Sequence, residues 1–168
     1  MPEQRGGCLL QLLALKKILV SLIVCFGAAA IGSAFTRPAV TGWYVTVQKP
    51  LLSPPNEVFG PVWTVLYFLM AVSLYLIWQK RHEGLPDNPA LLLFSAQLAL
   101  NVSWSAVFFG LQSIGGGLVV IGMLWLTLWA TIRRFWRLSR LAAICLLPYF
   151  IWLSFAAVLN FAIWRLNP

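Results

Sequence analysis

Charged residues are scarce in this 168-residue sequence, where Asp, Glu, Lys and Arg make up 10% of the chain, against about 25% in a soluble domain. Four stretches contain no Asp, Glu, Lys, Arg or His: residues 18–36, 58–79, 88–132 and 141–164. A helix crosses the hydrocarbon core of a bilayer in about 20 residues, so the first, second and fourth stretches each predict one membrane span. The third is about twice that length and carries three glycines within 112–117, which predicts two spans joined by a tight hairpin.

The fold class that follows is an all-α membrane protein, a bundle of five transmembrane helices. Segments of about ten residues with alternating polarity, which a transmembrane β-barrel needs, are absent. A competing interpretation of the first stretch is a cleavable signal peptide, since Lys16 and Lys17 precede an apolar run that ends in small residues. We expect a basic N-terminal extension at 1–17 and one membrane domain at 18–168, with helices at about 18–36, 58–79, 89–111, 116–134 and 141–164.

Ionisable groups are missing from the interior of every span, and this absence disfavours proton pumps and proton-coupled exporters, which place such groups at mid-depth. The single histidine, His82, lies in a charged loop and is expected to be solvated. The sequence contains no cluster with metal-ligand spacing, and no Ser/His/Asp or Cys/His set that could come together inside the membrane. Neither a metal nor an obligatory cofactor is therefore expected. Cys8, Cys25 and Cys145 are odd in number and imply no disulfide framework; acylation of Cys8 is the alternative to a free thiol.

The chain has a net charge of +8, and its basic residues lie near the ends of the predicted spans. This distribution indicates membrane topology and not a nucleic-acid-binding surface. Because Lys and Arg favour cytoplasmic loops, their distribution predicts that the N-terminus lies inside. They would also attract anionic headgroups. Nine fall on one side of a five-span chain (Arg5, Lys16, Lys17, Lys80, Arg81, Arg133, Arg134, Arg137 and Arg140) and three on the other (Arg37, Lys49 and Arg165).

Tryptophan is abundant, with nine residues. Some lie near span ends, where anchoring at the interface explains them, but Trp104, Trp125, Trp129 and Trp152 lie well inside spans, where each indole N–H needs a partner or a cavity. Helical spacing gathers aromatic and amide side chains into one stripe on each of three spans. The stripes are Trp63, Tyr67, Met70 or Ala71, and Leu74; Gln97, Asn101, Trp104 and Phe108; and Tyr149, Trp152, Ala156 and Asn160.

Lipid does not tolerate unsatisfied amides, so we expect the three stripes to face one another. Two interpretations stay open: the amides bond helix to helix, or the stripes form a pocket for a flat, largely apolar ligand. In the first span, Ala28 and Gly32 stand four residues apart and indicate a close helix contact, either within the bundle or in a homodimer.

Motifs along the chain resemble those of the TspO/MBR family, the translocator proteins also called peripheral-type or mitochondrial benzodiazepine receptors. The resemblance runs from the first predicted span to the C-terminal residues. The matching motifs are WY at 43–44, QKP at 48–50, PP at 54–55, GPVW at 60–63 with LY at 66–67, AQLALNVSWSAVFF at 96–109, and LLPYFIWLSFAAVLNFAIWRLN at 146–167.

The resemblance implies a five-helix bundle with a ligand pocket covered by the long loop between the first two spans. Prolines in this loop fix φ and hold it in extended or turn geometry, so we expect a pre-shaped lid. Carried over to this chain, the ligand-contacting residues are Tyr44, Pro54, Pro55, Trp63, Tyr67, Asn101, Trp104, Phe108, Trp152 and Ala156.

Two departures from the family pattern bear on the ligand. Leu52 stands where the family usually has an aromatic residue in the lid, and Phe161 stands where a cholesterol-recognition pattern requires Tyr. Such sterol patterns are weak even when complete, so sterol binding is doubtful.

The resemblance implies a membrane protein that binds porphyrin or haem and also accepts benzodiazepine-like ligands, acting as a sensor or regulator in a bacterial membrane or the mitochondrial outer membrane. An alternative is an enzyme that degrades protoporphyrin by photo-oxidative chemistry through Trp63 and Trp152. Another is passive transport of porphyrin or another lipophile, such as a sterol. Expected partners are the flat ligand, membrane lipids and a second copy of the chain, with no nucleic acid.

Overall fold

The computed structural model describes the backbone of residues 2–51, 53–82 and 88–168 and the side chains of 12–51, 53–80 and 89–168. The described chain is almost entirely helical and contains no strand, which confirms the all-α prediction. In chain order the elements are α1 (Pro2–Thr41), α2 (Trp43–Thr46), α3 (Asn56–His82), α4 (Asn88–Ser105), the π-helical turn η1 (Ala106–Gly110), α5 (Ile114–Leu138) and α6 (Arg140–Leu166).

Five helical segments in the described ranges are long and apolar enough to cross a membrane, which confirms the five-span prediction. Four of the five extend beyond the uncharged stretches, because residues such as Lys80 and Arg133 favour helix and continue it toward the membrane surface. α1 runs through residue 17 without a break, so an N-terminal extension distinct from the bundle stays a prediction. The segments are Leu12–Thr41, Asn56–Lys80, Pro89–Gly110, Ile114–Leu138 and Arg140–Leu166.

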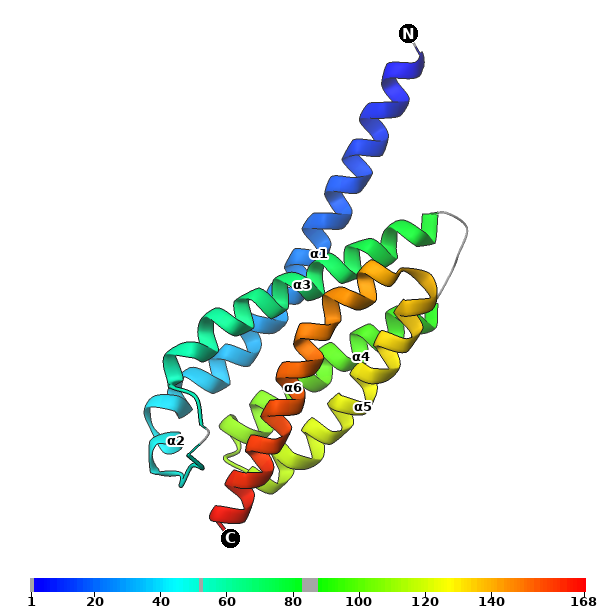
Figure 1. The fold of residues 1–168 in the computed structure, drawn as a ribbon. Coiled ribbons are helices and arrows are strands. Elements are labelled where there is room, and N and C mark those ends of the chain that lie inside the picture. Colours follow the sequence, from blue (N-terminus) through cyan, green and yellow to red (C-terminus); the bar gives the residue numbers. More distant parts are fainter. Residues whose placement is uncertain (1, 52, 83–87) are drawn as a thin grey trace.

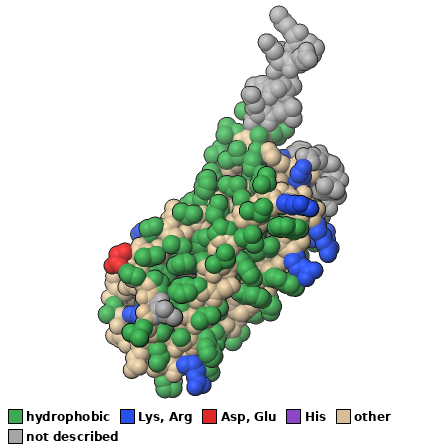
Figure 2. Space-filling view, in the orientation of Figure 1, with side chains coloured by type: hydrophobic (Ala, Val, Ile, Leu, Met, Phe, Trp, Pro, Cys, Tyr) green, Lys and Arg blue, Asp and Glu red, His purple; other side chains and the backbone are tan. Residues whose placement is uncertain are grey.

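The helices form a closed ring. α1 contacts α3 and α4, α3 also contacts α6, α6 contacts α5, and α5 contacts α4. Figure 1 shows the two chain termini at opposite ends of the bundle, as an odd number of spans requires. Hydrophobic side chains cover most of the face shown in Figure 2, and its Lys and Arg side chains gather mainly toward the end where α5 meets α6.

Packing between the helices combines ring contacts with a few hydrogen bonds. Phe94 of α4 and Phe135 of α5 stack with their centroids 6.0 Å apart and an interplanar angle of 6°. Ser73 Oγ donates to the Ala142 carbonyl at 2.7 Å, joining α3 to α6. Lipid is as apolar as the helix surfaces, so such close packing and interhelical bonding stabilise the bundle.

The hairpin between α4 and α5 is shorter than the glycine run suggested. Gln112 adopts a left-handed conformation with φ 53°, and Ser113 Oγ caps α5 by accepting from the Gly116 N–H at 3.2 Å. The three glycines therefore lie in the first turns of α5. Gly117 is a point of close approach, because an added Cβ would lie 2.8 Å from Cδ2 of Phe108.

The connection between α1 and α3, residues 42–55, is held against the end of the bundle; we refer to it as the α1–α3 loop. Its proline-rich part is non-helical where it is described, and the Ser53 N–H bonds the Pro50 carbonyl at 3.0 Å. Asn167, at the end of α6, accepts from the Gln48 N–H and donates to the Gln48 carbonyl, both at 3.0 Å. Leu52, the departure noted above, lies outside the described residues.

Candidate functional site: an aromatic cavity

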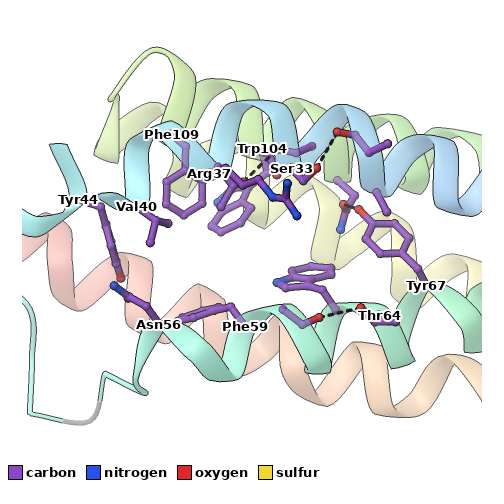
Figure 3. Close-up of a pocket in the computed structure, with 18 of the residues that line it drawn as sticks. Ser33, Arg37, Val40, Tyr44, Asn56, Phe59, Thr64, Tyr67, Trp104 and Phe109 are labelled. Carbon is purple, nitrogen blue, oxygen red and sulfur yellow. Dashed lines mark hydrogen bonds between the residues drawn. The ribbon is translucent and has the colours of Figure 1, made fainter. Parts of the chain in front are cut away.

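A cavity of about 770 Å³ lies between α1, α3 and the end of α4 that continues into η1. Figure 3 shows Tyr44 and Asn56 pointing toward one another at one end of it. α1 contributes Phe26, Ala29, Ala30, Gly32, Ser33, Thr36, Arg37, Val40 and Thr41, and α2 contributes Tyr44. The opposite walls are Asn56, Phe59, Gly60, Trp63, Thr64 and Tyr67 of α3 together with Asn101, Trp104, Ser105 and Phe109 of α4 and η1.

Aromatic rings form the largest surfaces of the cavity, and neighbouring rings hold them in place. Trp63 lies 5.7 Å from Tyr67 and 6.0 Å from Tyr149, centroid to centroid. Trp104 stacks on Phe108 at 5.4 Å with an interplanar angle of 22°. These ring contacts hold both indoles in fixed orientations at the cavity wall.

Hydrogen bonds fix the inner end of the cavity. Tyr67 Oη donates to Asn101 Oδ1 at 2.5 Å, and Asn101 Nδ2 donates to Tyr149 Oη at 2.7 Å. One amide therefore joins α3, α4 and α6, while Asn101 also lines the cavity. Gln97, one turn earlier, is fully buried, with its Nε2 4.0 Å from Met70 Sδ.

Asn160 of α6 does not line the cavity but orients a residue that does. Its Oδ1 accepts from Trp104 Nε1 at 3.2 Å, and its Nδ2 donates to the Ile114 carbonyl at 3.0 Å. These two bonds tie the indole of Trp104 to α5 and α6. The stripes predicted from spacing therefore do turn inward, and their amides act as bonds between helices.

Ten ligand contacts were expected, and the structure brings five of them together on the cavity wall: Tyr44, Trp63, Tyr67, Asn101 and Trp104. Phe108 lies behind Trp104, and Trp152 lies behind Phe59, with ring centroids 5.9 Å apart. Ala156 packs in the core, and Pro54 and Pro55 precede α3 in the α1–α3 loop. Ligand contact stays a prediction for all ten residues, including these five that do not line the cavity.

The wall supplied by α1 was missed, because its small and hydroxyl side chains form no aromatic stripe. One signal was present in the Ala28 and Gly32 pair. A Cβ added to Gly32 would lie 3.3 Å from Ser105 Oγ, so the small residue allows α1 to approach α4 closely. Gly32 itself lines the cavity.

The cavity wall carries little charge. Arg37 is the one charged side chain among the lining residues, and burial raises the pKa of Tyr44 above its usual value. Tyr44 therefore stays protonated at neutral pH and can donate a hydrogen bond. No group of three His, Cys, Asp or Glu side chains that could bind a metal occurs in the described ranges.

Comparison with known proteins agrees with this architecture. The profile of the TspO/MBR family matches residues 20–165. Tryptophan-rich protein TspO of Chlorobaculum tepidum is 40% identical over 162 residues, covering 92% of this chain and all of that protein.

Two further relatives have different names. Tryptophan-rich sensory protein of Cereibacter sphaeroides is 36% identical over 150 residues, covering 89% of this chain and 91% of its own. The human translocator protein is 39% identical over 139 residues, which is 82% of each chain. These matches confirm the resemblance: the chain belongs to the TspO/MBR family and is a multi-pass integral membrane protein.

Proposed function

We propose that this protein is a membrane sensor or regulator that binds a porphyrin or haem in the aromatic cavity. The observation that carries the proposal is the cavity of about 770 Å³ with the rings of Trp63, Tyr67 and Trp104 in its walls. Ligand pockets typically measure about 300–1,000 Å³ and combine apolar walls with a few polar groups. Flat macrocycles suit stacking against indole faces. The relative from Cereibacter sphaeroides is named a sensory protein, which supports a signalling role.

A titration of the whole protein with protoporphyrin IX in lipid nanodiscs tests this function. The Soret band of the porphyrin is the readout, because removing a tryptophan would itself change the protein fluorescence. In the wild type we expect saturable binding, absent from empty nanodiscs. Trp63→Leu should weaken it about tenfold, which is about 1.4 kcal/mol.

Trp129→Leu is the matched control, because Trp129 lies on α5 with 44% of its surface exposed and does not line the cavity. It should bind like the wild type. Equal, unsaturating uptake by all three proteins and by empty nanodiscs would mean that porphyrin only partitions into lipid, and the proposal would be wrong.

Two further measurements address degradation and transport. If the protein turns porphyrin over, the Soret band decays in light and a bilin-like absorbance rises, and both changes are lost in Trp63→Phe and in Trp152→Phe. If it transports porphyrin, sealed vesicles show flux that depends on the protein without any coupling ion, since the described parts of the spans hold no ionisable group at mid-depth suited to coupling.

We also propose that the N-terminus lies inside, so that the α1–α3 loop lies on the outer side. The support is the charge distribution: Lys16, Lys17, Arg133, Arg137 and Arg140 lie toward one end of the spans, whereas Arg37, Lys49 and Arg165 lie toward the other. In oriented vesicles, an impermeant thiol reagent should reach Thr46→Cys from outside and Ser139→Cys only after lysis, in a background without the native cysteines.

A further inference from the structure

We propose that Arg37 makes the cavity selective for an anionic ligand, by binding a carboxylate in the part of the cavity that its guanidinium faces. This inference rests on the proposed function, because it specifies which form of a flat ligand the same cavity prefers. Arg37 lies near the C-terminal end of α1 and lines the cavity. Figure 3 shows its guanidinium directed into the space between α1 and α3.

Within the described chain, no acidic side chain pairs with the Arg37 guanidinium. Glu57 is the only acidic residue whose side chain is described; it does not line the cavity, and it makes no ion pair with Arg37. A guanidinium presents a planar fork of N–H donors that matches a carboxylate, and such charge-assisted bonds are about twice as strong as neutral ones.

Other polar groups of the cavity wall leave the donor role largely to Arg37. Four hydroxyls of the wall donate to carbonyls of their own helices: Ser33 to Ala30 at 2.8 Å, Thr36 to Gly32 at 3.0 Å, Thr41 to Pro38 at 3.3 Å and Thr64 to Gly60 at 2.9 Å. Tyr44 and Asn56 are further neutral donors, at one end of the cavity.

The other cations at this end of the bundle are directed elsewhere. Lys49 Nζ lies 4.5 Å from the centroid of the Tyr44 ring, in a cation–π contact, and is not part of the cavity wall. Arg165 lies in the last turn of α6 and also lies outside the wall. Removing Arg165 therefore removes the same charge from the same end of the molecule without changing the cavity.

The test compares protoporphyrin IX with its dimethyl ester, which keeps the macrocycle but carries no negative charge. Dissociation constants for both are measured in zwitterionic nanodiscs for the wild type, Arg37→Gln and Arg165→Gln. We expect the wild type to bind the free acid at least tenfold more tightly than the ester. In Arg37→Gln the acid should bind about as weakly as the ester, while ester binding stays at the wild-type value and shows that the cavity is intact.

Arg165→Gln should retain the wild-type preference. If Arg37→Gln also retains it, or if the wild type binds acid and ester equally, the inference is overturned while the proposed function stands; the first result would be expected if lipid phosphate alone engages Arg37. If neither compound binds the wild type saturably, the proposed function itself fails.

Discussion

Asn101 is the most connected polar side chain of the cavity. Its side-chain amide hydrogen-bonds two tyrosines from different helices: it accepts from Tyr67 of α3 and donates to Tyr149 of α6. Asn101 and both tyrosines are almost fully buried, so these hydrogen bonds lie inside the bundle. The amide is therefore both a bond between helices and part of the cavity wall, so its two roles need separate measurements.

Replacing Asn101 by Leu should destabilise the bundle by about 1–2 kcal/mol, because interhelical hydrogen bonds in membranes average about 0.6 kcal/mol each and two tyrosine hydroxyls lose their partner. The midpoint of unfolding in a denaturing-detergent titration measures this. Ser103→Ala is the control, since Ser103 is exposed on the same helix and bonds only the Ala99 carbonyl. A midpoint for Asn101→Leu equal to that of Ser103→Ala would contradict the assigned role.

Helix packing around α5 depends on the position of each glycine. Gly117 faces Phe108 and Asn160, and an added Cβ would lie 2.8 Å from Phe108 Cδ2 and 3.1 Å from Asn160 Oδ1. Gly122, on the same helix, has no heavy atom within 4 Å of the added Cβ. The helix therefore has room for a side chain at Gly122 but not at Gly117.

Gly117→Ala should lower stability by about 1–3 kcal/mol through overpacking. Gly122→Ala should leave stability unchanged or raise it by up to about 1 kcal/mol, because Ala is the better helix former. Thermal unfolding followed by circular dichroism compares the two. If both variants lose stability equally, close packing at Gly117 is not the cause.

Element types and the faces of α3, α4 and α6 could be predicted, because uncharged length and helical period are local properties of the sequence. Trp63, Asn101 and Trp104 were placed correctly toward the interior for this reason. The α1 wall could not be predicted, since it depends on which neighbours approach Gly32. Trp152 shares the inward period of α6 but lies behind Phe59, and only the packing of α3 against α6 decides this.

At the scale of the whole molecule, Asn167 connects segments 119 residues apart in sequence. Its side chain bonds both polar backbone groups of Gln48 and so ties the α1–α3 loop to the end of α6. Tyr44 in the same loop is buried against Phe108 and Phe109 of η1, at 6.2 Å and 5.7 Å between ring centroids. The loop is thus fastened at two points that lie on different helices.

Asn167→Ala should release one of these points. The Gln48 amide loses its acceptor, so we expect its hydrogen exchange to accelerate at least tenfold, about 1.4 kcal/mol of protection. Hydrogen exchange of peptides that cover residues 45–50 measures this. Arg165→Ala, two residues away and with its side chain exposed, should leave the exchange unchanged. Equal exchange in Asn167→Ala and the wild type would show that the loop is held without this bond.

The π-helical turn η1 makes the third span one residue longer than an α-helix that covers the same distance along its axis. The Leu111 N–H bonds the Ala106 carbonyl at 2.8 Å, five residues back, and this wider turn carries Phe109 to the cavity while Phe108 supports Trp104. Deleting one residue between 106 and 110 would let this turn close into an ordinary α-helical turn and remove the wider turn that carries Phe109 to the cavity. Chain length, as well as residue type, is therefore constrained at this point. A relative whose alignment has a one-residue gap at this point would have to build this cavity wall without Phe109.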